Sequence, residues 1–168
     1  MYSYLSEAPV SSLSQLLELE SSPMTFTGLS PPVCLSATYN HSPQFPSEYN
    51  YMRVDNPNFD LLERQLSLLH GGKEALVFAS GIAAISTAFS CFCMSGQYVL
   101  CASEVYSNTP KCLAFLKEMA GIHTALFDIH QTDAETVLEI IKTKVPNPEE
   151  NLRVLFMETA SNPGGFIP

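Results

Sequence analysis

The chain has 168 residues, of which 46% are hydrophobic, enough for one domain, or part of one, with a real core. Its formal net charge is −9 with few Lys and Arg residues, which argues against a nucleic-acid surface because basic contacts to phosphate dominate that affinity. The cysteines match no C-x-x-C pattern and the histidines are scattered, so no metal site is predicted. The start has neither a basic n-region nor an apolar h-region, so we expect a cytoplasmic protein without a secretory signal.

Residues 1–48 are predicted to form an N-terminal arm. Ser12 to Leu19 has the pattern of a short amphipathic helix, and a Pro- and Ser-rich extended segment runs from Ser21 to Ser47. An arm of this kind buries little by itself. We therefore expect it to wrap another part of the molecule or a second subunit.

An aromatic and basic cluster at 49–53 precedes a helix whose start and end are both marked in the sequence. Arg53 offers a planar charged fork that suits phosphate, and the Tyr51 phenol can donate one more hydrogen bond, although a plain surface strand explains the cluster too. Asn56-Pro57 then opens a helix that Gly71-Gly72 ends. Its expected buried face consists of Phe59, Leu62, Leu66 and Leu69.

The apolar stretch from Ala75 to Met94 organises the rest of the chain. It predicts a strand at Glu74 to Ala79, a turn at Ser80-Gly81 and a helix from Ile82 to Cys93, with the thiols of this helix buried. The turn offers free N–H groups and a positive helix end to an anion, although most such turns bind nothing. The uncharged run is long enough for a membrane span of roughly 20 residues, but its interspersed Ser, Thr and Gly residues favour a buried α/β core.

Strands and helices alternate after this stretch and predict a mainly parallel sheet with flanking helices. The expected strands are Gln97 to Ala102, Ile122 to Phe127 and Arg153 to Met157. A capping box at Thr132 to Glu135 begins a helix whose inward residues are Val137, Ile140 and Ile141, and Lys144 to Asn151 is expected to be a polar loop. Tyr106 follows a strand, where it could either stack on a ligand or pack in the core.

Five ordered motifs resemble the Cys/Met-metabolism family of pyridoxal-phosphate (PLP) enzymes, which includes cystathionine γ-synthase, cystathionine γ-lyase and methionine γ-lyase. They are the arm segment Pro32 to Tyr39, Tyr51-x-Arg53-x-x-Asn56-Pro57, the phosphate turn Phe78 to Ala84, the loop Val105-Tyr106-x-x-Thr109, and Glu158-Thr159-x-Ser161-Asn162-Pro163. The resemblance implies an aspartate aminotransferase-like (fold type I) large domain, of which residues 49–168 would be the N-terminal part.

The resemblance also implies roles around the cofactor phosphate. Gly81 and Ile82 would give backbone N–H groups to the PLP phosphate of their own subunit. Tyr51 and Arg53 would reach the phosphate of a neighbouring subunit's PLP, so a homodimer or tetramer is expected.

Further implied roles concern the cofactor ring and the substrate. Tyr106 would stack on the pyridine ring and assist proton transfer as a catalytic residue, and Asn162 would hydrogen-bond the phenolic oxygen. Glu158 would support the loop that carries Asn162. Lys111 lies where some family members place a basic residue toward the amino-acid substrate.

Two departures limit the implied activity. The family sequence continues beyond Pro168 to an Asp that pairs with the pyridine nitrogen and to the Ser-x-Thr-Lys segment of the Schiff-base lysine, and no lysine of this chain has that context. Ser107-Asn108 also replaces the usual Gly-Gly or Gly-Cys.

Two hypotheses follow from these departures. The first is the N-terminal portion of a trans-sulfuration enzyme, a carbon–sulfur lyase or γ-synthase acting on sulfur amino acids or homoserine esters and inactive by itself. The alternative is a non-catalytic chain that binds a phosphate ligand or pairs with a full-length paralogue. A nucleotide-binding domain is weaker, because no G-x-G-x-x-G follows a strand.

Overall fold

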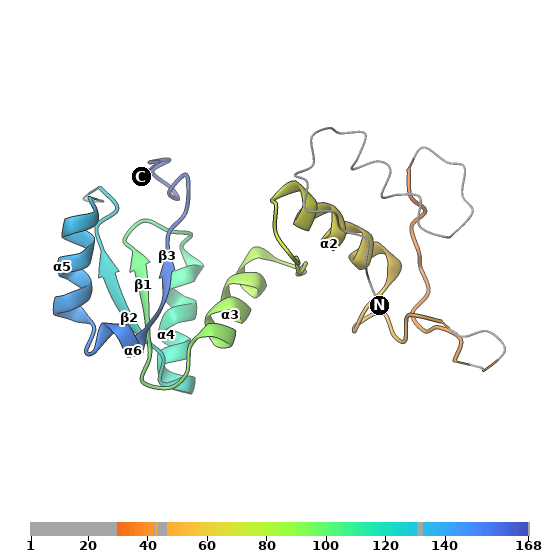
Figure 1. The fold of residues 1–168 in the computed structure, drawn as a ribbon, viewed down its shortest axis with the longest axis horizontal. Helices are drawn as coiled ribbons and strands as arrows, with labels where there is room; N and C mark the ends of the chain where they lie inside the picture. The colour runs from red at the N-terminus through yellow and green to blue at the C-terminus, as the bar shows by residue number, and fades with distance from the viewer. Residues whose placement is uncertain (1–29, 42, 44–46, 131–132, 168) are drawn as a thin grey trace. The chain divides into compact units, whose positions relative to one another are not determined.

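The computed structural model describes residues 30–41, 43, 47–130 and 133–167 as two compact units (Figure 1). The first unit is Met1–Val77 and the second is Phe78–Pro168. The expected helix at Ser12 to Leu19 lies outside the described residues, as does much of the predicted arm.

Helix α2 (Pro57–Leu69) is the main element of the first unit, and it begins where the sequence predicts. The Asn56 side chain caps it by accepting hydrogen bonds from the N–H groups of Asn58 at 2.9 Å and Phe59 at 3.2 Å. Asn58 in turn pairs with the backbone of Cys34, accepting from its N–H at 2.9 Å and donating to its carbonyl at 2.8 Å. These contacts fix part of the extended segment against the start of the helix.

The predicted buried face of α2 is largely exposed in this chain. Phe59, Leu62 and Leu69 are 43%, 44% and 60% exposed, and Ser67 is the residue of α2 that is buried. The periodicity identified an apolar face correctly, but the described part of the first unit holds no sheet or second helix to cover it. The expectation of burial is therefore wrong for the isolated chain.

A three-stranded parallel sheet forms the centre of the second unit. Its strands are β1 (Tyr98–Ala102), β2 (His123–Phe127) and β3 (Leu152–Phe156), in the order β2-β1-β3. Both pairings are parallel, as the alternation of strands and helices predicts. The central strand β1 supplies Val99, Leu100 and Cys101 to the core, each with no exposed surface.

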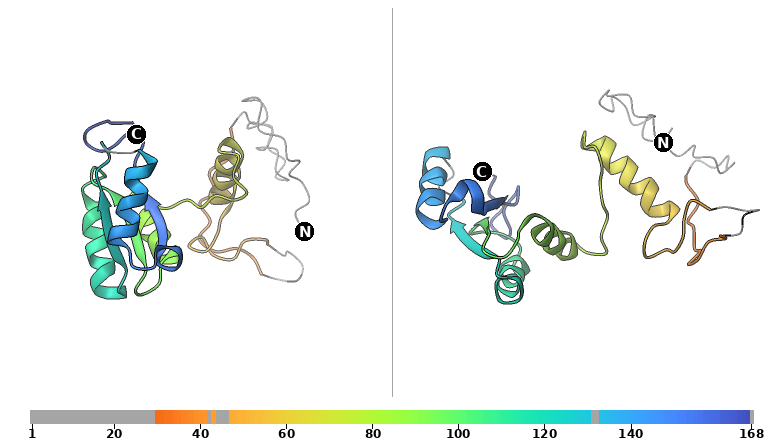
Figure 2. Two further views of the ribbon diagram at one scale, coloured as in Figure 1. Left: turned by 60° about the vertical axis from the view of Figure 1, so that its left-hand side comes forward. Right: turned by 60° about the horizontal axis from the view of Figure 1, so that its bottom comes forward.

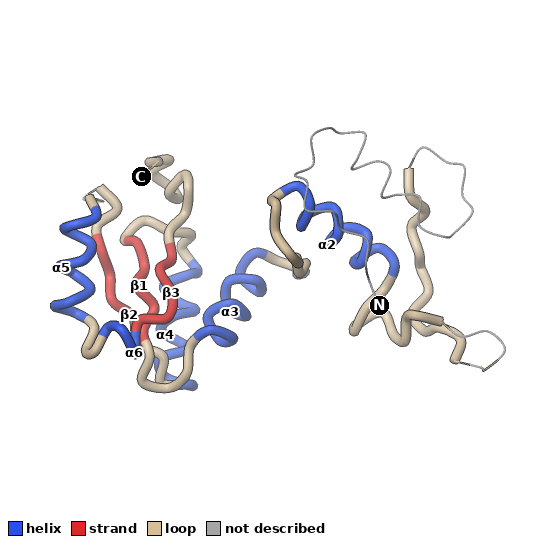
Figure 3. Tube along the Cα trace, viewed as in Figure 1, coloured by secondary structure: helices blue, strands red, loops and turns tan. Residues whose placement is uncertain are grey.

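In the part of the chain that the structure describes, four helices accompany the sheet (Figures 1 and 3). They are α3 (Gly81–Phe92), α4 (Asn108–Ala120), α5 (Ala134–Lys144) and α6 (Pro148–Asn151). The step from β1 to β2 and the step from β2 to β3 run in opposite directions across the sheet, so right-handed crossovers place α4 and α5 on opposite faces. Figure 2 shows this arrangement, with β2 between the two helices.

The predicted strand at Glu74 to Ala79 is absent, which corrects the sequence-based expectation. Strands exist only as hydrogen-bonded ladders, and no described strand pairs with this segment. The N–H of Val77 donates instead to the Glu63 carboxylate at 2.9 Å. Leu76 and Phe78 are exposed.

Two details around α5 also differ from the prediction. Asp133 rather than Thr132 is the N-cap, and its carboxylate accepts from the N–H of Thr136 at 2.8 Å. The expected polar loop contains α6, which begins with Pro148 at the first turn followed by two glutamates that favour a helix N-terminus. The inward residues Val137, Ile140 and Ile141 do pack against the core, as predicted.

The cysteines are free, and their burial partly differs from the prediction. Cys93 and Cys101 are buried, whereas Cys91 is exposed. Helix α3 is largely apolar, but the described residues bury only one side of it, at Phe89. Cys91 lies on a part of the helix that they leave exposed.

Candidate functional site

The loops that follow β1, β2 and β3 carry the polar side chains that form a candidate site. The carboxyl ends of parallel strands meet at one edge of the sheet, which is where open α/β sheets bind ligands. The loop after β1 carries Glu104 and Tyr106, the loop after β2 carries His130, and the turn after β3 carries Glu158 to Phe166.

The Tyr106 phenol lies at one end of a short chain of side-chain hydrogen bonds. Its phenolic oxygen accepts from Asn108 Nδ2 at 2.9 Å, and Asn108 Oδ1 accepts from Lys111 Nζ at 3.2 Å. The Tyr106 side chain is 39% exposed, so it does not pack in the core. The structure thus brings Tyr106 and Lys111 together through Asn108, a residue to which the sequence assigned no role.

Glu158 connects the β3 turn to the loop of Tyr106. One oxygen of its carboxylate accepts from the backbone N–H of Tyr106 at 2.9 Å. Because the bond is to the backbone, it fixes the path of the loop and leaves the aromatic ring free. Asn162 lies further along the same turn and is exposed.

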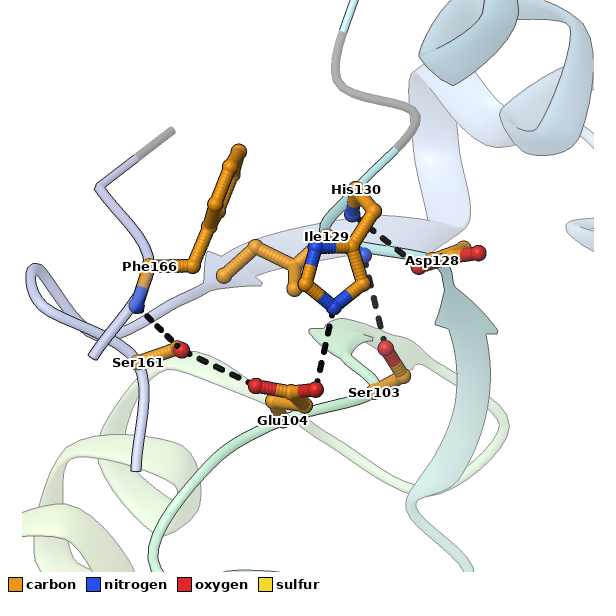
Figure 4. A network of polar contacts seen from close by, with 7 residues as sticks. All are labelled: Ser103, Glu104, Asp128, Ile129, His130, Ser161 and Phe166. Carbon is orange, nitrogen blue, oxygen red and sulfur yellow. Dashed lines mark hydrogen bonds and ion pairs between the residues drawn. The ribbon is translucent and has the colours of Figure 1, made fainter. Parts of the chain in front are cut away.

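A second network, formed by Glu104, His130 and Ser161, was not predicted from the sequence (Figure 4). Glu104 Oε1 lies 3.0 Å from His130 Nε2, and Glu104 Oε2 accepts from the Ser161 hydroxyl at 3.0 Å. The hydrogen bond to His130, followed by that from Ser161, lowers the pKa of the Glu104 carboxyl. The available signal was an acid in the loop after one strand and a His in the loop after the next, which only the sheet order could bring together.

The start of α3 offers unpaired backbone donors. Ser80 caps the helix, and its hydroxyl accepts from the N–H of Ala83 at 3.3 Å. Among the described residues nothing accepts from the N–H groups of Gly81 and Ile82, and a Cβ added at Gly81 would meet no atom within 4 Å. Free N–H groups at a helix N-terminus suit an anion such as phosphate.

Tyr51 and Arg53 lie together in the first unit, whereas the other predicted site residues belong to the second. The guanidinium carbon of Arg53 lies 4.6 Å from the centroid of the Tyr51 ring, in cation–π contact. Tyr51 also pairs with Thr38 in an antiparallel bridge. Arg53 itself remains exposed, so its charge is available to an anion.

A cavity of about 220 Å³ in the first unit does not suit an anionic ligand. Its lining includes four carboxylates, Glu48, Asp55, Asp60 and Glu63. The Tyr49 hydroxyl donates to Asp60 at 3.0 Å, and burial together with this bond raises the pKa of the Tyr49 phenol. Negative lining charges oppose phosphate, which leaves the start of α3 as the better candidate.

Neither a metal site nor a membrane-spanning helix is found among the described residues. No group of three or more His, Cys, Asp or Glu side chains there is placed to hold a metal ion. None of the helices in the same ranges is long and apolar enough to cross a membrane.

The parallel sheet with helices on both faces matches part of the fold type I PLP enzymes. Cystathionine γ-lyase from yeast aligns with a TM-score of 0.71 at 22% identity, covering 100% of this chain and 39% of that one. The cystathionine γ-lyase CalE6 from Micromonospora echinospora aligns with a TM-score of 0.72 at 30% identity, covering 89% of this chain and 37% of that one. The expected fold class is confirmed.

The family follows from the sequence match. The family model described as Cys/Met metabolism PLP-dependent enzyme matches residues 14–167, and the chain belongs to this family. Cystathionine β-lyase of Bacillus subtilis is 36% identical over 115 residues, which are 68% of this chain and 27% of the relative. Human cystathionine γ-lyase is 28% identical over 134 residues, 79% of this chain and 31% of the relative. The chain thus spans about a third of the length of the curated relatives it matches.

Proposed function

We propose that this chain is the N-terminal portion of a trans-sulfuration enzyme, a carbon–sulfur lyase or γ-synthase acting on sulfur amino acids or homoserine esters. Membership of the Cys/Met metabolism family supports the reaction class. The unpaired N–H groups of Gly81 and Ile82 are the observation that carries the proposal for this chain, because they offer a phosphate its backbone donors.

The residues at the strand ends fit the ring of PLP. The exposed ring of Tyr106 offers a stacking surface, and Asn162 offers an amide to the phenolic oxygen. Glu158 joins the Tyr106 loop to the turn that carries Asn162, which helps to hold the Tyr106 ring and the Asn162 amide at a constant distance from each other. PLP, when bound, supplies an electron sink for bond cleavage next to the amino-acid α-carbon.

Asn108 and Lys111 support a polar role for the Tyr106 phenol. Asn108 donates to the phenolic oxygen, so the O–H of Tyr106 stays free to hold a proton toward the substrate. Lys111 lies one hydrogen bond further along and carries a positive charge that suits an amino-acid carboxylate.

Tyr51 and Arg53 would complete the phosphate site of a neighbouring subunit. Their cation–π contact pre-orients the guanidinium, and its donors remain exposed for an anion. We accordingly propose a homodimer or tetramer as the working assembly.

Binding of PLP to the purified chain tests this proposal. We expect PLP to bind more tightly than pyridoxal, which lacks the phosphate, when both are compared by equilibrium dialysis. Gly81→Pro removes one donor at the first position of α3, where Pro fits the helix, and should weaken PLP binding while leaving pyridoxal unaffected. Equal affinity for PLP and pyridoxal would refute the phosphate site.

Ala134→Pro provides a matched control, since it places the same residue at the first position of α5. Ser80 and Asp133, which precede the two sites, are both extended, as a residue before Pro requires. The control should leave PLP affinity unchanged. We also expect that the chain with added PLP releases no ketoacid and thiol from cystathionine. Steady turnover would contradict the proposal that activity requires a further portion of the enzyme.

A second candidate function is a non-catalytic subunit that pairs with a full-length paralogue. The exposed apolar face of α2 favours it, because such a face requires a partner. Co-purification distinguishes the candidates: a subunit should be recovered in stoichiometric complex with a complete family member, and a separate enzyme portion should not.

A further inference from the structure

We propose that Glu104 is a positioning residue that holds the β3 turn, and with it Asn162, at a fixed place relative to Tyr106. The role of Asn162 toward PLP rests on the proposed function. The hold on the turn rests on contacts of this chain alone. Glu104 binds His130 and Ser161 (Figure 4), and Gly164 lies close to its carboxylate.

The Glu104 carboxylate joins the ends of all three strands. It follows β1, and its two oxygens bind side chains that follow β2 and β3, His130 at 3.0 Å and Ser161 at 3.0 Å. Hydrogen bonds to a charged carboxylate are stronger than neutral ones. One carboxylate therefore sets the spacing of three loops that belong to different strands.

Ser161 transmits this hold to the whole turn. Its side chain is buried at 4% exposure, and its hydroxyl accepts from the N–H of Phe166 at 3.0 Å while donating to Glu104. Its backbone donates to the Phe166 carbonyl at 2.7 Å and accepts from the N–H of Gly165 at 2.8 Å. These bonds close the turn around Ser161, so the position of Ser161 determines the position of the turn.

Close approach of the turn to Glu104 requires the glycine at position 164. A Cβ added at Gly164 would collide with the Glu104 carboxylate, whose two oxygens are both engaged. On the other side, the His130 ring packs against Phe166 with centroids 4.9 Å apart. Asn162 lies between Ser161 and Gly164, so its backbone position is set by these two contacts.

The turn is fixed at its other end as well. Glu158 accepts from the N–H of Tyr106, so the segment that carries Asn162 is tied at both ends to the loop after β1. A serine-hydrolase arrangement does not explain the network, because the Ser161 hydroxyl donates to Glu104 and not to His130.

Amide hydrogen exchange of the turn tests the hold without any ligand. In Glu104→Gln, the negative charge that strengthens both contacts is lost; in Ser161→Ala, the hydroxyl bonds disappear. We expect the N–H groups of Gly165 and Phe166 to exchange about tenfold faster in both variants, as for loss of a hydrogen bond to a charged group. Unchanged exchange at these amides would overturn the proposal.

The ionisation of the PLP phenol tests the link to Asn162. Asn162→Ala should shift the pH at which the absorbance of bound PLP changes, and Glu104→Gln should shift it in the same direction. The double variant should shift little beyond Asn162→Ala, because Glu104 acts through Asn162. Additive shifts, or an unchanged titration in Glu104→Gln, would show that Glu104 does not position Asn162.

Asp133→Asn is the matched control, because it neutralises another hydrogen-bonded carboxylate of the same unit. It should change neither the exchange of the turn nor the PLP titration. If the unmodified chain binds no PLP, the proposed function fails, while the exchange measurement still decides whether Glu104 holds the turn.

Discussion

Single residues of this chain differ in reactivity because of their immediate surroundings, and the thiols show this directly. The Tyr39 hydroxyl, 3.5 Å from the Cys34 sulfur, lowers the pKa of that thiol. Burial raises the pKa of Cys93 and Cys112, and it raises the pKa of Cys101 to about 11. The thiolate is the reactive species, so acidity and access together set the rate of labelling.

We therefore predict that a thiol reagent at neutral pH labels Cys34 and the exposed Cys91 first and Cys101 last. Mass spectrometry of peptides from timed samples measures the order. The same reagent applied in denaturant should label all five cysteines at similar rates, which controls for intrinsic differences. Early labelling of Cys101 in the folded chain would contradict its burial in β1.

Gly121 is a second position where one residue decides local structure. It ends α4 in the left-handed region with φ 68°, and an added Cβ would lie 2.6 Å from the Ser95 hydroxyl. Gly121→Ala should lower the free energy of unfolding by about 1–2 kcal/mol for the backbone conformation, and further through the contact with Ser95. Gly96→Ala has a positive φ but no nearby atom, so denaturant unfolding should show a smaller loss there.

The sequence predicted single residues well where their effect is local. Asn56 caps α2 as expected because a cap needs only the next three residues. The link between Glu104, His130 and Ser161 could not be predicted, because it depends on which strands are neighbours. Tyr106 and Lys111 were identified by motif, and their connection through Asn108 emerged only from the geometry.

Helices and strands were predicted correctly where the residues that determine them lie within the element itself. All three strands of the sheet and helices α2 and α3 lie close to their predicted bounds, and α5 begins near its predicted capping box, because periodicity and caps specify them locally. The segment at 74–79 has an equally apolar pattern but forms no strand, since pairing depends on a neighbour rather than on the segment. The apolar face of α2 was likewise predicted correctly, but its burial was not.

The cap of α5 makes the stability of this helix dependent on pH. The side-chain and backbone groups of Thr136 donate to Asp133 and lower the pKa of its carboxyl. A carboxyl with a lowered folded-state pKa contributes stability above its unfolded pKa, and this contribution is lost as the pH falls through the folded value. We predict that the amides of α5 become less protected from exchange as the pH falls below about 4.

Asp133→Asn separates the charge from the cap, because Asn also accepts from a helix N-terminus. The variant should keep most of the protection of α5 at pH 7 and lose most of its dependence on acid. Hydrogen exchange at several pH values compares the two proteins. An unchanged pH dependence in the variant would show that Asp133 is not the group responsible.

The whole molecule combines a sheet that is well packed at its centre with surfaces that are not covered. Strand β3 has a neighbour on one side only within the described sheet, and Leu155 on it is exposed. Large apolar side chains are also exposed on both units, among them Leu69, Leu76, Phe92 and Met119. Unpaired strand edges and apolar surface of this kind favour association.

We predict that the isolated chain is poorly stable and prone to aggregate. On heating it should show a broad, irreversible loss of far-UV signal and should bind a hydrophobic dye before the transition, because apolar groups are accessible in the native state. Co-expression with a full-length family member should suppress dye binding and sharpen the transition if that protein covers these surfaces. A soluble monomer with a sharp, reversible, cooperative melt would contradict the prediction, since it would require the core around β1 to stabilise the chain despite the exposed face of α2 and the open edge of β3.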